Sequence, residues 1–449
     1  MDKVIEKYAA RQIPRYTSYP TAPHFNSGVS AATYRKWLGE LGEDQTLSLY
    51  LHIPFCRSMC WYCGCHTKVT KRYDPVADYT EHLAREIDIV AGAIDARPAV
   101  THVHWGGGSP TILADEDFVS IMKRLNDRFR LSSEAEIAVE IDPRTLDMAK
   151  TKALAASGVN RASLGVQDFD AKVQEQINRV QPRPLVARSV SDLRAVGIEA
   201  ISFDLMYGLP GQTVEGCVAT VEQAVEMEPD RISVFGYAHV PWMKTHQRLI
   251  SDESLPDGGL RFEQSEAIAE TLERDGYVRV GLDHFARRDD AMAQALAEGN
   301  LRRNFQGYTT DTADALIGLG VSAIGVLPRG YVQNTSDAGG YARSLEDGAL
   351  TTARGFLLDD EDRLRRAVIE KLMCDLEVDL EAAIREYGRA SDHFTEEVAA
   401  MAEMIEEGVV EFDKTTVRMT ELGRPVVRAV CALFDSYLGQ GRGRHSGAV

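Results

Sequence analysis

Six short strand-like runs alternate with helix-like segments, and this alternation constrains the fold more than any other feature of the chain. The runs are apolar or β-branched, end in Gly, Pro or Asp, and comprise Leu47–Ile53, His102–Trp105, Ile137–Ile141, Arg161–Leu164, Ala200–Met206 and Arg231–Phe235. Such alternation predicts a parallel sheet with right-handed crossovers. Because a closed barrel has eight units, we predict an α/β fold built on a partial, TIM-like (β/α)6 barrel with an open side. An open doubly wound sheet is the alternative.

The segments between these runs carry helical signals. Tyr79, Leu83 and Ile87 recur at helical spacing after Asp74, which we predict to be an N-cap followed by a first-turn proline. Further helices are predicted near residues 115–129, 146–156, 186–196 and 214–227.

Composition divides the chain into four predicted parts. Residues 1–45 are dense in aromatic residues and proline, and we expect an extended arm that covers another surface as a lid. Residues 46–350 hold the barrel and an extension with Gly-rich turns. Residues 351–438 begin with an acidic amphipathic helix and end near a small hairpin, which predicts a mainly helical, winged-helix-like domain. The Gly-rich residues 439–449 are predicted to be a flexible tail.

Charge and apolar content exclude several classes of protein. Among 449 residues, 50 are basic and 68 acidic, and the net charge of −18 argues against a nucleic-acid or anionic-membrane binder. The sequence contains no run of about 18 apolar residues, which a membrane-spanning helix needs. The first residues, Met1–Glu6, lack the apolar core of a secretory signal.

The seven cysteines do not resemble a disulfide framework, because their number is odd and four lie within ten residues. This usage predicts a reducing cytoplasm and a metal site. We expect the three scattered cysteines, Cys217, Cys374 and Cys431, to be core residues.

Cys56, Cys60 and Cys63 form a C-x3-C-x2-C run directly after the first predicted strand. Three thiolates on one short loop can ligate three irons of a [4Fe–4S] cluster and leave the fourth iron open. A structural zinc site is the alternative, because Cys65 or His66 could complete a tetrahedron. The position after a strand places the loop at the C-terminal mouth of the barrel, where such folds have their active sites.

Polar residues follow the other predicted strands at the same rim. The run Gly106–Ser109 follows the second strand, and its glycines could let the backbone approach a ligand and turn amides toward a carboxylate or phosphate. Each such residue alone is commonly a turn residue, but their succession predicts a lined pocket. The later strands end near Glu140 and Asp142, Gln167 and Asp168, Asp204, and Tyr237 to His239.

The cysteine loop resembles the signature of the radical S-adenosylmethionine (SAM) enzymes. The wider sequence resembles one family among them, the oxygen-independent coproporphyrinogen III oxidases of bacterial haem synthesis, over nearly the whole chain. The blocks that carry this resemblance are Arg15–Thr21, Tyr50–Cys56, Cys63–Cys65, Gly281–Ala286 and Asn304–Thr310. Related haem chaperones typically lack the first and the last of these blocks.

The resemblance implies roles for individual residues. Cys56, Cys60 and Cys63 would hold the cluster, whose open iron would take the amino and carboxylate groups of SAM. The positions that match this SAM site are Tyr50, Gly107, Glu140, Ala238 and Ile324, and those that match a second SAM site are Tyr62, Gly108, Ser109, Gln167, Arg179 and Asp204. Tyr62 and Ser109 replace commoner Phe and Thr but keep the aromatic face and the hydroxyl. Cys65, which is not a cluster ligand in the family, and Tyr16 of the arm are the candidate catalytic residues.

The resemblance also implies the reaction. Reductive cleavage of SAM would yield methionine and a 5′-deoxyadenosyl radical, which takes a hydrogen from the β-carbon of a propionate. Carbon dioxide leaves, an acceptor removes one electron, and a vinyl group remains. Two propionates of coproporphyrinogen III would react in this way and give protoporphyrinogen IX. The enzyme would need an electron donor, an electron acceptor and one or two SAM molecules, and we expect a cytoplasmic monomer.

Two further expectations concern the substrate and the competing functions. A substrate with four carboxylates needs local arginines on this acidic chain, and Arg15, Arg287, Arg302 and Arg303 are candidates. The alternatives to the decarboxylating enzyme are a haem-chaperone or haem-degrading radical SAM relative, and a zinc-stabilised scaffold that uses the C-terminal part.

Overall fold

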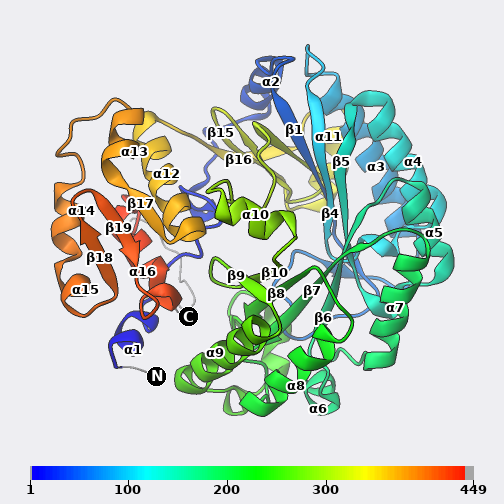
Figure 1. Ribbon diagram of the computed structural model, residues 1–449. Coiled ribbons are helices and arrows are strands. Elements are labelled where there is room, and N and C mark those ends of the chain that lie inside the picture. The colour runs from blue at the N-terminus through cyan, green and yellow to red at the C-terminus, as the bar shows by residue number, and fades with distance from the viewer. Residues whose placement is uncertain (1–2, 440–449) are drawn as a thin grey trace.

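The computed structural model describes residues 3–439, and a single curved sheet dominates it (Figure 1). Six parallel strands lie side by side in chain order. They are β1 (Thr46–Ile53), β4 (Ala99–Gly107), β5 (Arg130–Ile141), β6 (Arg161–Gln167), β7 (Ala200–Tyr207) and β8 (Arg231–Gly236). This succession confirms the partial (β/α)6 barrel, because a doubly wound sheet would reverse its strand order in the middle.

Helices connect the parallel strands, and Figure 1 shows most of them on the outer side of the sheet. They are α3 (Asp74–Ala91), α4 (Asp115–Arg128), α5 (Met148–Ala156), α6 (Ala171–Gln176), α7 (Arg183–Ala195) and α8 (Val214–Val225). The predicted N-cap is wrong by one residue. Tyr73 is the N-cap of α3, and Asp74 is its first helical residue, where a negative charge is favourable.

Further strands extend the sheet at both ends. Beside β1 lies the parallel strand β13, followed by three antiparallel strands, and beside β8 lie the antiparallel β10 and β9. The outermost strands, β16 and β9, are the two edges of an unclosed sheet. The bounds are β9 (Tyr277–Val280), β10 (His284–Arg287), β13 (Ala315–Leu319), β14 (Ile324–Leu327), β15 (Gly330–Asn334) and β16 (Thr352–Leu357).

Shorter elements complete the barrel and its extension. Two small pairs of strands lie outside the main sheet, and one of them contains the first cysteine of the loop. These elements are β2 (Phe55–Cys56), β3 (Lys68–Val69), β11 (Arg302–Asn304), β12 (Gly307–Thr309), α9 (Gly258–Arg274), α10 (Ala291–Ala297) and α11 (Ala338–Glu346).

The C-terminal part packs helices against a three-stranded sheet of order β17-β19-β18. The strands β18 (Val410–Asp413) and β19 (Thr416–Met419) confirm the predicted hairpin. The remaining elements are α12 (Asp360–Asp375), β17 (Glu377–Asp379), α13 (Leu380–Glu386), α14 (Thr395–Ala400), α15 (Ala402–Glu406) and α16 (Val427–Cys431). Apart from residue 439, the predicted tail lies outside the described residues.

The N-terminal arm joins the C-terminal part to the sheet. It contains two helices that were not predicted, α1 (Lys3–Ala9) and α2 (Ala31–Gly39), and Figure 1 shows α1 beside the C-terminal elements. Between the two helices, Tyr16 and Tyr19 enter the apolar cluster of the C-terminal part. The Tyr331 hydroxyl of β15 donates to the carbonyl oxygen of Tyr19 at 3.0 Å. The arm therefore contacts both the C-terminal part and the main sheet.

Glu86 of α3 ties the added strands to the helices. Its buried carboxylate accepts hydrogen bonds from the Gly320 amide (2.6 Å) and the Tyr341 hydroxyl (2.7 Å). It also accepts from Asn334 Nδ2 (2.6 Å) and the Thr351 hydroxyl (3.0 Å). Burial raises the pKa of Glu86, so the surrounding donors, which favour the charged form, only partly offset desolvation.

We predict that Glu86→Ala lowers the free energy of unfolding by about 3 kcal/mol, because buried donors lose their acceptor. Glu86→Gln keeps one acceptor oxygen in place and should lose less. Urea unfolding at pH 7 measures both variants. Equal stability of the two variants would contradict the role given to the hydrogen bonds.

Candidate active site

The glycine run at the end of β4 holds the base of the cysteine loop. The Gly108 amide donates to the Ile53 carbonyl and the Ser109 amide to the Phe55 carbonyl, both at 2.8 Å. A Cβ atom on Gly108 would lie 2.6 Å from the Phe55 oxygen, so a larger residue does not fit. These two amides are used within the protein, which corrects the expectation that they face an anionic ligand. The Gly107 amide does face a carboxylate, that of Glu140 at 3.2 Å.

Side chains from two later segments hold the loop from outside. Asn178 Nδ2 donates to the carbonyl of Met59 at 2.8 Å. The buried Gln247 donates to the carbonyls of Tyr62 (2.9 Å) and Ala238 (3.2 Å). The loop is thereby connected to the chain that leaves β8.

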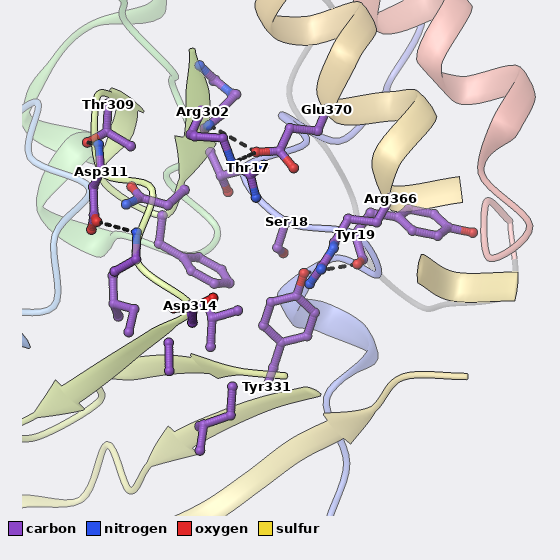
Figure 2. Close-up of a pocket in the computed structure, with 18 of the residues that line it drawn as sticks. Thr17, Ser18, Tyr19, Arg302, Thr309, Asp311, Asp314, Tyr331, Arg366 and Glu370 are labelled. Atoms are coloured by element: carbon purple, nitrogen blue, oxygen red, sulfur yellow. Dashed lines mark hydrogen bonds and ion pairs between the residues drawn. The ribbon is translucent and has the colours of Figure 1, made fainter. Parts of the chain in front are cut away.

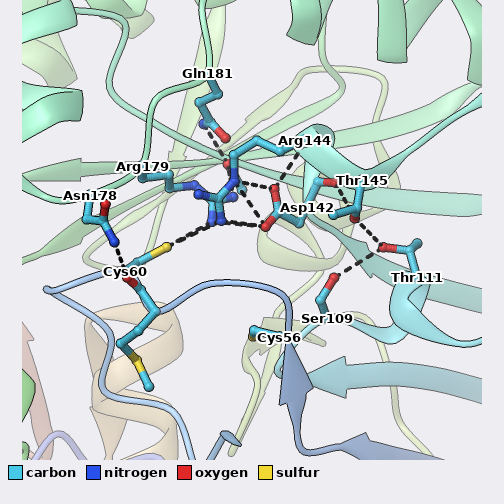
Figure 3. Close-up of polar contacts among 12 residues, drawn as sticks. Cys56, Cys60, Ser109, Thr111, Asp142, Arg144, Thr145, Asn178, Arg179 and Gln181 are labelled. Atoms are coloured by element: carbon cyan, nitrogen blue, oxygen red, sulfur yellow. Dashed lines mark hydrogen bonds and ion pairs between the residues drawn. The ribbon is translucent and has the colours of Figure 1, made fainter. Parts of the chain in front are cut away.

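Two arginines converge on the Cys60 sulfur (Figure 3). Arg179 Nη1 lies 3.4 Å and Arg144 Nη2 3.5 Å from Cys60 Sγ. Asp142 holds both guanidiniums, at 2.6 Å from Arg144 and 3.6 Å from Arg179. Although burial opposes it, hydrogen bonding from Arg144 keeps the pKa of Asp142 below its usual value. Cys60 Sγ therefore lies within hydrogen-bonding range of two guanidiniums.

The other two loop sulfurs also accept hydrogen bonds. The Thr67 hydroxyl donates to Cys56 Sγ at 3.3 Å, and the Cys65 amide donates to Cys63 Sγ at 3.4 Å. Hydrogen bonding from the Cys65 side chain lowers the pKa of Cys63 to about 6. Burial raises the pKa of Cys56 to about 11, which favours the thiol at neutral pH until a metal displaces the proton.

This donor set fits a [4Fe–4S] cluster. Soft thiolates with N–H and O–H donors are the usual environment of such clusters, and these donors tune the reduction potential. Arg179 Nε is buried without a hydrogen-bond partner in residues 3–439, and an anionic group could use it.

The candidates for the cluster-bound SAM meet at the strand ends next to the loop. The Tyr50 ring of β1 stacks on His104 at 5.8 Å, and His104 Nε2 lies 3.0 Å from Glu140 Oε1. Ile324 begins β14, and its backbone lies against Gly318, the register partner of Tyr50. The structure therefore brings candidates from β1, β5 and β14 together.

The candidates for the second SAM line the neighbouring strands. Gln167 ends β6 with a left-handed φ of 69°, an uncommon conformation that is enriched at functional sites. Arg179 Nη2 donates to the Gly165 carbonyl of the same strand at 2.6 Å. Asp204 of β7 accepts from Ser163 at 3.2 Å, and both line a cavity of about 260 Å³ inside the barrel. Burial first, and then the charge of Glu140, raise the pKa of Asp204 to about 6.

Tyr62 and Ser109 are the remaining candidates for the second SAM. Tyr62 packs with the apolar cluster around Leu209 and Ile250. Ser109 is buried, and its hydroxyl lies 3.2 Å from that of Thr111.

The two candidate catalytic residues lie in different surroundings. Cys65 is exposed, and its backbone amide donates to Cys63 Sγ, so it lies beside an expected cluster ligand. Tyr16 is 4% exposed, and its hydroxyl donates to Asp435 at 3.0 Å within the C-terminal cluster. The structure thus places Tyr16 in a core and not with the cysteine loop.

Sequence reasoning missed the residues that hold the loop sulfurs and carbonyls. Arg144 lies two residues after Asp142, with Pro143 between them, so its place at the rim was a usable signal. The others carry no strand-end signal, since two lie in loops and Gln247 lies in a short 3-10 helix: Thr67, Asn178 and Gln247.

The fold and the cysteine loop together define a radical SAM protein, and comparison with known families supports this class. The family model of the radical SAM superfamily matches residues 50–224, and that of the HemN C-terminal domain matches residues 358–426.

Curated relatives define the family more narrowly. The oxygen-independent coproporphyrinogen III oxidase of Bradyrhizobium diazoefficiens is 50% identical over 442 residues, which cover 98% of each chain. That of Paracoccus denitrificans is 41% identical over 438 residues, 98% of this chain and 97% of the relative. The solved structure of coproporphyrinogen III oxidase (HemN) from Escherichia coli matches with a TM-score of 0.91 at 36% identity, covering 95% of this chain and 100% of that one. The chain belongs to the oxygen-independent coproporphyrinogen III oxidase family.

We predict that Cys60→Ala abolishes cluster binding while the fold remains, because Cys60 lies in a loop at the barrel rim. Iron and acid-labile sulfide, about four of each per chain in the anaerobic wild type, should fall close to zero. Circular dichroism should be unchanged. Cys217→Ala, at a buried cysteine of α8, is the control and should keep its iron. Full iron content in Cys60→Ala would refute the assignment.

The second prediction concerns Asp204. Its folded-state pKa of about 6 exceeds the ordinary 3.8, so its contribution to stability is complete below pH 3.8 and is lost as the pH rises through 6. Asn mimics the protonated acid. We therefore expect Asp204→Asn to melt at a higher temperature than the wild type at pH 8, with the difference shrinking towards pH 4. A difference independent of pH would be inconsistent with this titration.

Proposed function

We propose that the chain converts two propionate side chains of coproporphyrinogen III to vinyl groups without oxygen, and so forms protoporphyrinogen IX in haem synthesis. When bound, the [4Fe–4S] cluster and SAM supply the 5′-deoxyadenosyl radical that takes the propionate hydrogen. The activity for which the relatives are named supports this function. The observation on this chain that carries it is an arginine-lined cavity next to the barrel mouth.

The arginine cavity has a volume of about 530 Å³ and lies between the arm, the end of β8 and the C-terminal part. Ala238, a candidate SAM contact, also lines it, so the cavity adjoins the cofactor position. Its charged walls comprise five arginines and two carboxylates: Arg15, Arg261, Arg279, Arg303, Arg428, Glu266 and Asp283. A local positive excess on a chain with a net charge of −18 suits a substrate with four carboxylates.

The guanidiniums of the arginine cavity are only partly neutralised. Arg279 lies 3.0 Å from Glu266, whereas Arg303 lies over the Tyr308 ring at 4.3 Å. Burial, together with the charge of Arg15, lowers the pKa of Arg428 to about 10. A carboxylate that enters the cavity would offset this crowding of positive charge.

Of the four arginines suggested from sequence, two line the arginine cavity and two lie outside it. Arg15 and Arg303 line the arginine cavity. Arg287 lies outside it, 3.7 Å from Asp289. Arg302 lies 3.1 Å from Glu370 beside an adjoining cavity of about 150 Å³ (Figure 2). Two of the five arginines that line the cavity were therefore among the candidates from sequence.

The arm shields the proposed reaction space. Its residues Gln12, Arg15 and Thr17 form part of the wall of the arginine cavity. Radical chemistry needs a dry site, and an arm held by the buried Tyr16 and Tyr19 supplies a fixed cover. This interpretation keeps the lid role for the arm and gives Tyr16 a positioning role.

Turnover also needs an electron donor and an electron acceptor. We further propose that the chain works as a cytoplasmic monomer. All seven cysteines are free thiols, which fits a reducing compartment. Within residues 3–439, no helix combines the length and the apolar character that crossing a membrane requires.

An anaerobic assay with coproporphyrinogen III, SAM and dithionite tests the function. We expect carbon dioxide and a product with two vinyl groups. A haem chaperone or a haem-degrading relative would form neither product. A chain with an intact cluster that releases no carbon dioxide would refute the proposal.

We predict that Arg15→Gln and Arg428→Gln each raise the KM for coproporphyrinogen III about 30-fold, the equivalent of about 2 kcal/mol, with a smaller effect on kcat. Both side chains bind the substrate in this proposal and do not touch the reacting atoms. Arg287→Gln, outside the cavity, is the matched control and should stay within about twofold of the wild type. An unchanged KM in both variants would place the substrate elsewhere.

A further inference from the structure

Two segments around the cysteine loop carry basic residues and no acidic ones, on a chain with 68 acidic residues. Residues 54–73 contain Arg57, Lys68, Lys71 and Arg72. Residues 237–251 contain Lys244 and Arg248. This distribution differs sharply from the net charge of −18 for the whole chain.

The two segments meet at the outer edge of the loop. Lys244 Nζ donates to the Cys65 carbonyl at 2.9 Å. Burial is the main cause that lowers the pKa of His66, and the charges of Lys244 and Lys68 lower it further. Both lysines therefore lie near His66. Arg57 donates to the Lys71 carbonyl at 3.2 Å. We call this group, Arg57, Lys68, Lys71, Arg72 and Lys244, the basic collar.

The only carboxylate bound to the basic collar by an ion pair in residues 3–439 is that of Asp74, 2.6 Å from Arg72. Both side chains of this pair are more than three-quarters exposed, so the pair is weak and leaves the collar strongly positive.

Large apolar side chains are exposed beside the basic collar. Val69 is 43% exposed, Trp242 51% and Met243 65%. Exposed aromatic and Met side chains within a charged rim are the composition of a protein–protein interface. The neighbouring cysteine loop is itself open to solvent at Cys65.

We propose that the basic collar docks an acidic one-electron carrier protein that reduces the cluster. The inference rests on the proposed function, because that function requires one electron at the cluster for each SAM cleaved. The carrier loses one electron, the bound cluster gains it, and no bond or proton changes at the surface. The acidic remainder of the chain repels such a carrier, so electrostatic steering directs it to the collar next to the cluster ligands.

The test uses the reconstituted enzyme and an acidic flavodoxin as probe. The charge-reversal variant Lys68→Glu/Lys71→Glu changes two exposed side chains that hold no cluster, SAM or substrate position. Lys36→Glu/Lys152→Glu makes the same charge change on α2 and α5, and is the matched control. Binding of oxidised flavodoxin is measured by calorimetry, and formation of 5′-deoxyadenosine is measured with reduced flavodoxin or with dithionite.

We expect the collar variant to weaken flavodoxin binding and flavodoxin-driven SAM cleavage at least about tenfold at low salt, with the difference shrinking at high salt. Its dithionite-driven rate should stay within about twofold of the wild type, and the control variant should match the wild type in all three measurements.

Several outcomes would overturn the docking proposal. They are equal loss in the collar and control variants, no loss in either, and collar-dependent binding of anionic lipid vesicles without binding of flavodoxin. Failure of the proposed function would look different, because the wild type would then form no vinyl product even with dithionite.

Discussion

The close approach of the β4 glycines to the base of the cysteine loop is the contact on which the site depends. Two backbone hydrogen bonds from Gly108 and Ser109 continue the pairing of β1 and β4 beyond the sheet and start the loop at a fixed point. A side chain at Gly108 would collide with both the Phe55 and the Ile53 carbonyl oxygens. Because the three thiols lie within eight residues of that point, the geometry of the loop follows from this backbone contact.

Electrostatics then distinguishes the three sulfurs. Cys60 faces two arginines, Cys63 faces the amide and thiol of Cys65, and Cys56 faces one hydroxyl. These unequal surroundings come from the loop itself and from the chain after β5 and β6. Donors to ligand sulfurs raise reduction potentials, so the protein tunes the cluster through residues that do not ligate it.

The barrel could be predicted because each buried parallel strand has a local sequence pattern, a short apolar run followed by turn residues. Its extension could not. The strand β13 is only Ala315–Leu319, and its pairing with β1 joins residues more than 260 positions apart. The helix α9 begins with two glycines and carries charged residues along its length, so its sequence gives a weak periodic signal.

The site also contains one group of residues that could be predicted from sequence and one that could not. The thiols and most rim residues follow strand ends, so a motif and its spacing suffice to find them. The arginine cavity collects Arg15, Arg261 and Arg428 from positions spread over almost the whole chain. A set of this kind has no spacing to recognise and becomes visible only when the chain is folded.

The meeting of the arm with the C-terminal part has a consequence for biosynthesis. Gln12, Arg15 and Thr17 form one wall of the arginine cavity, and the neighbouring Tyr16 is held by Asp435. The loop sulfurs and their donors, in contrast, all lie between residues 56 and 179. A nascent chain can therefore complete the metal-binding half long before the cavity has its last wall. The arginine cavity gains this wall only after the C-terminal part has been synthesised, so the cysteine loop can be completed first.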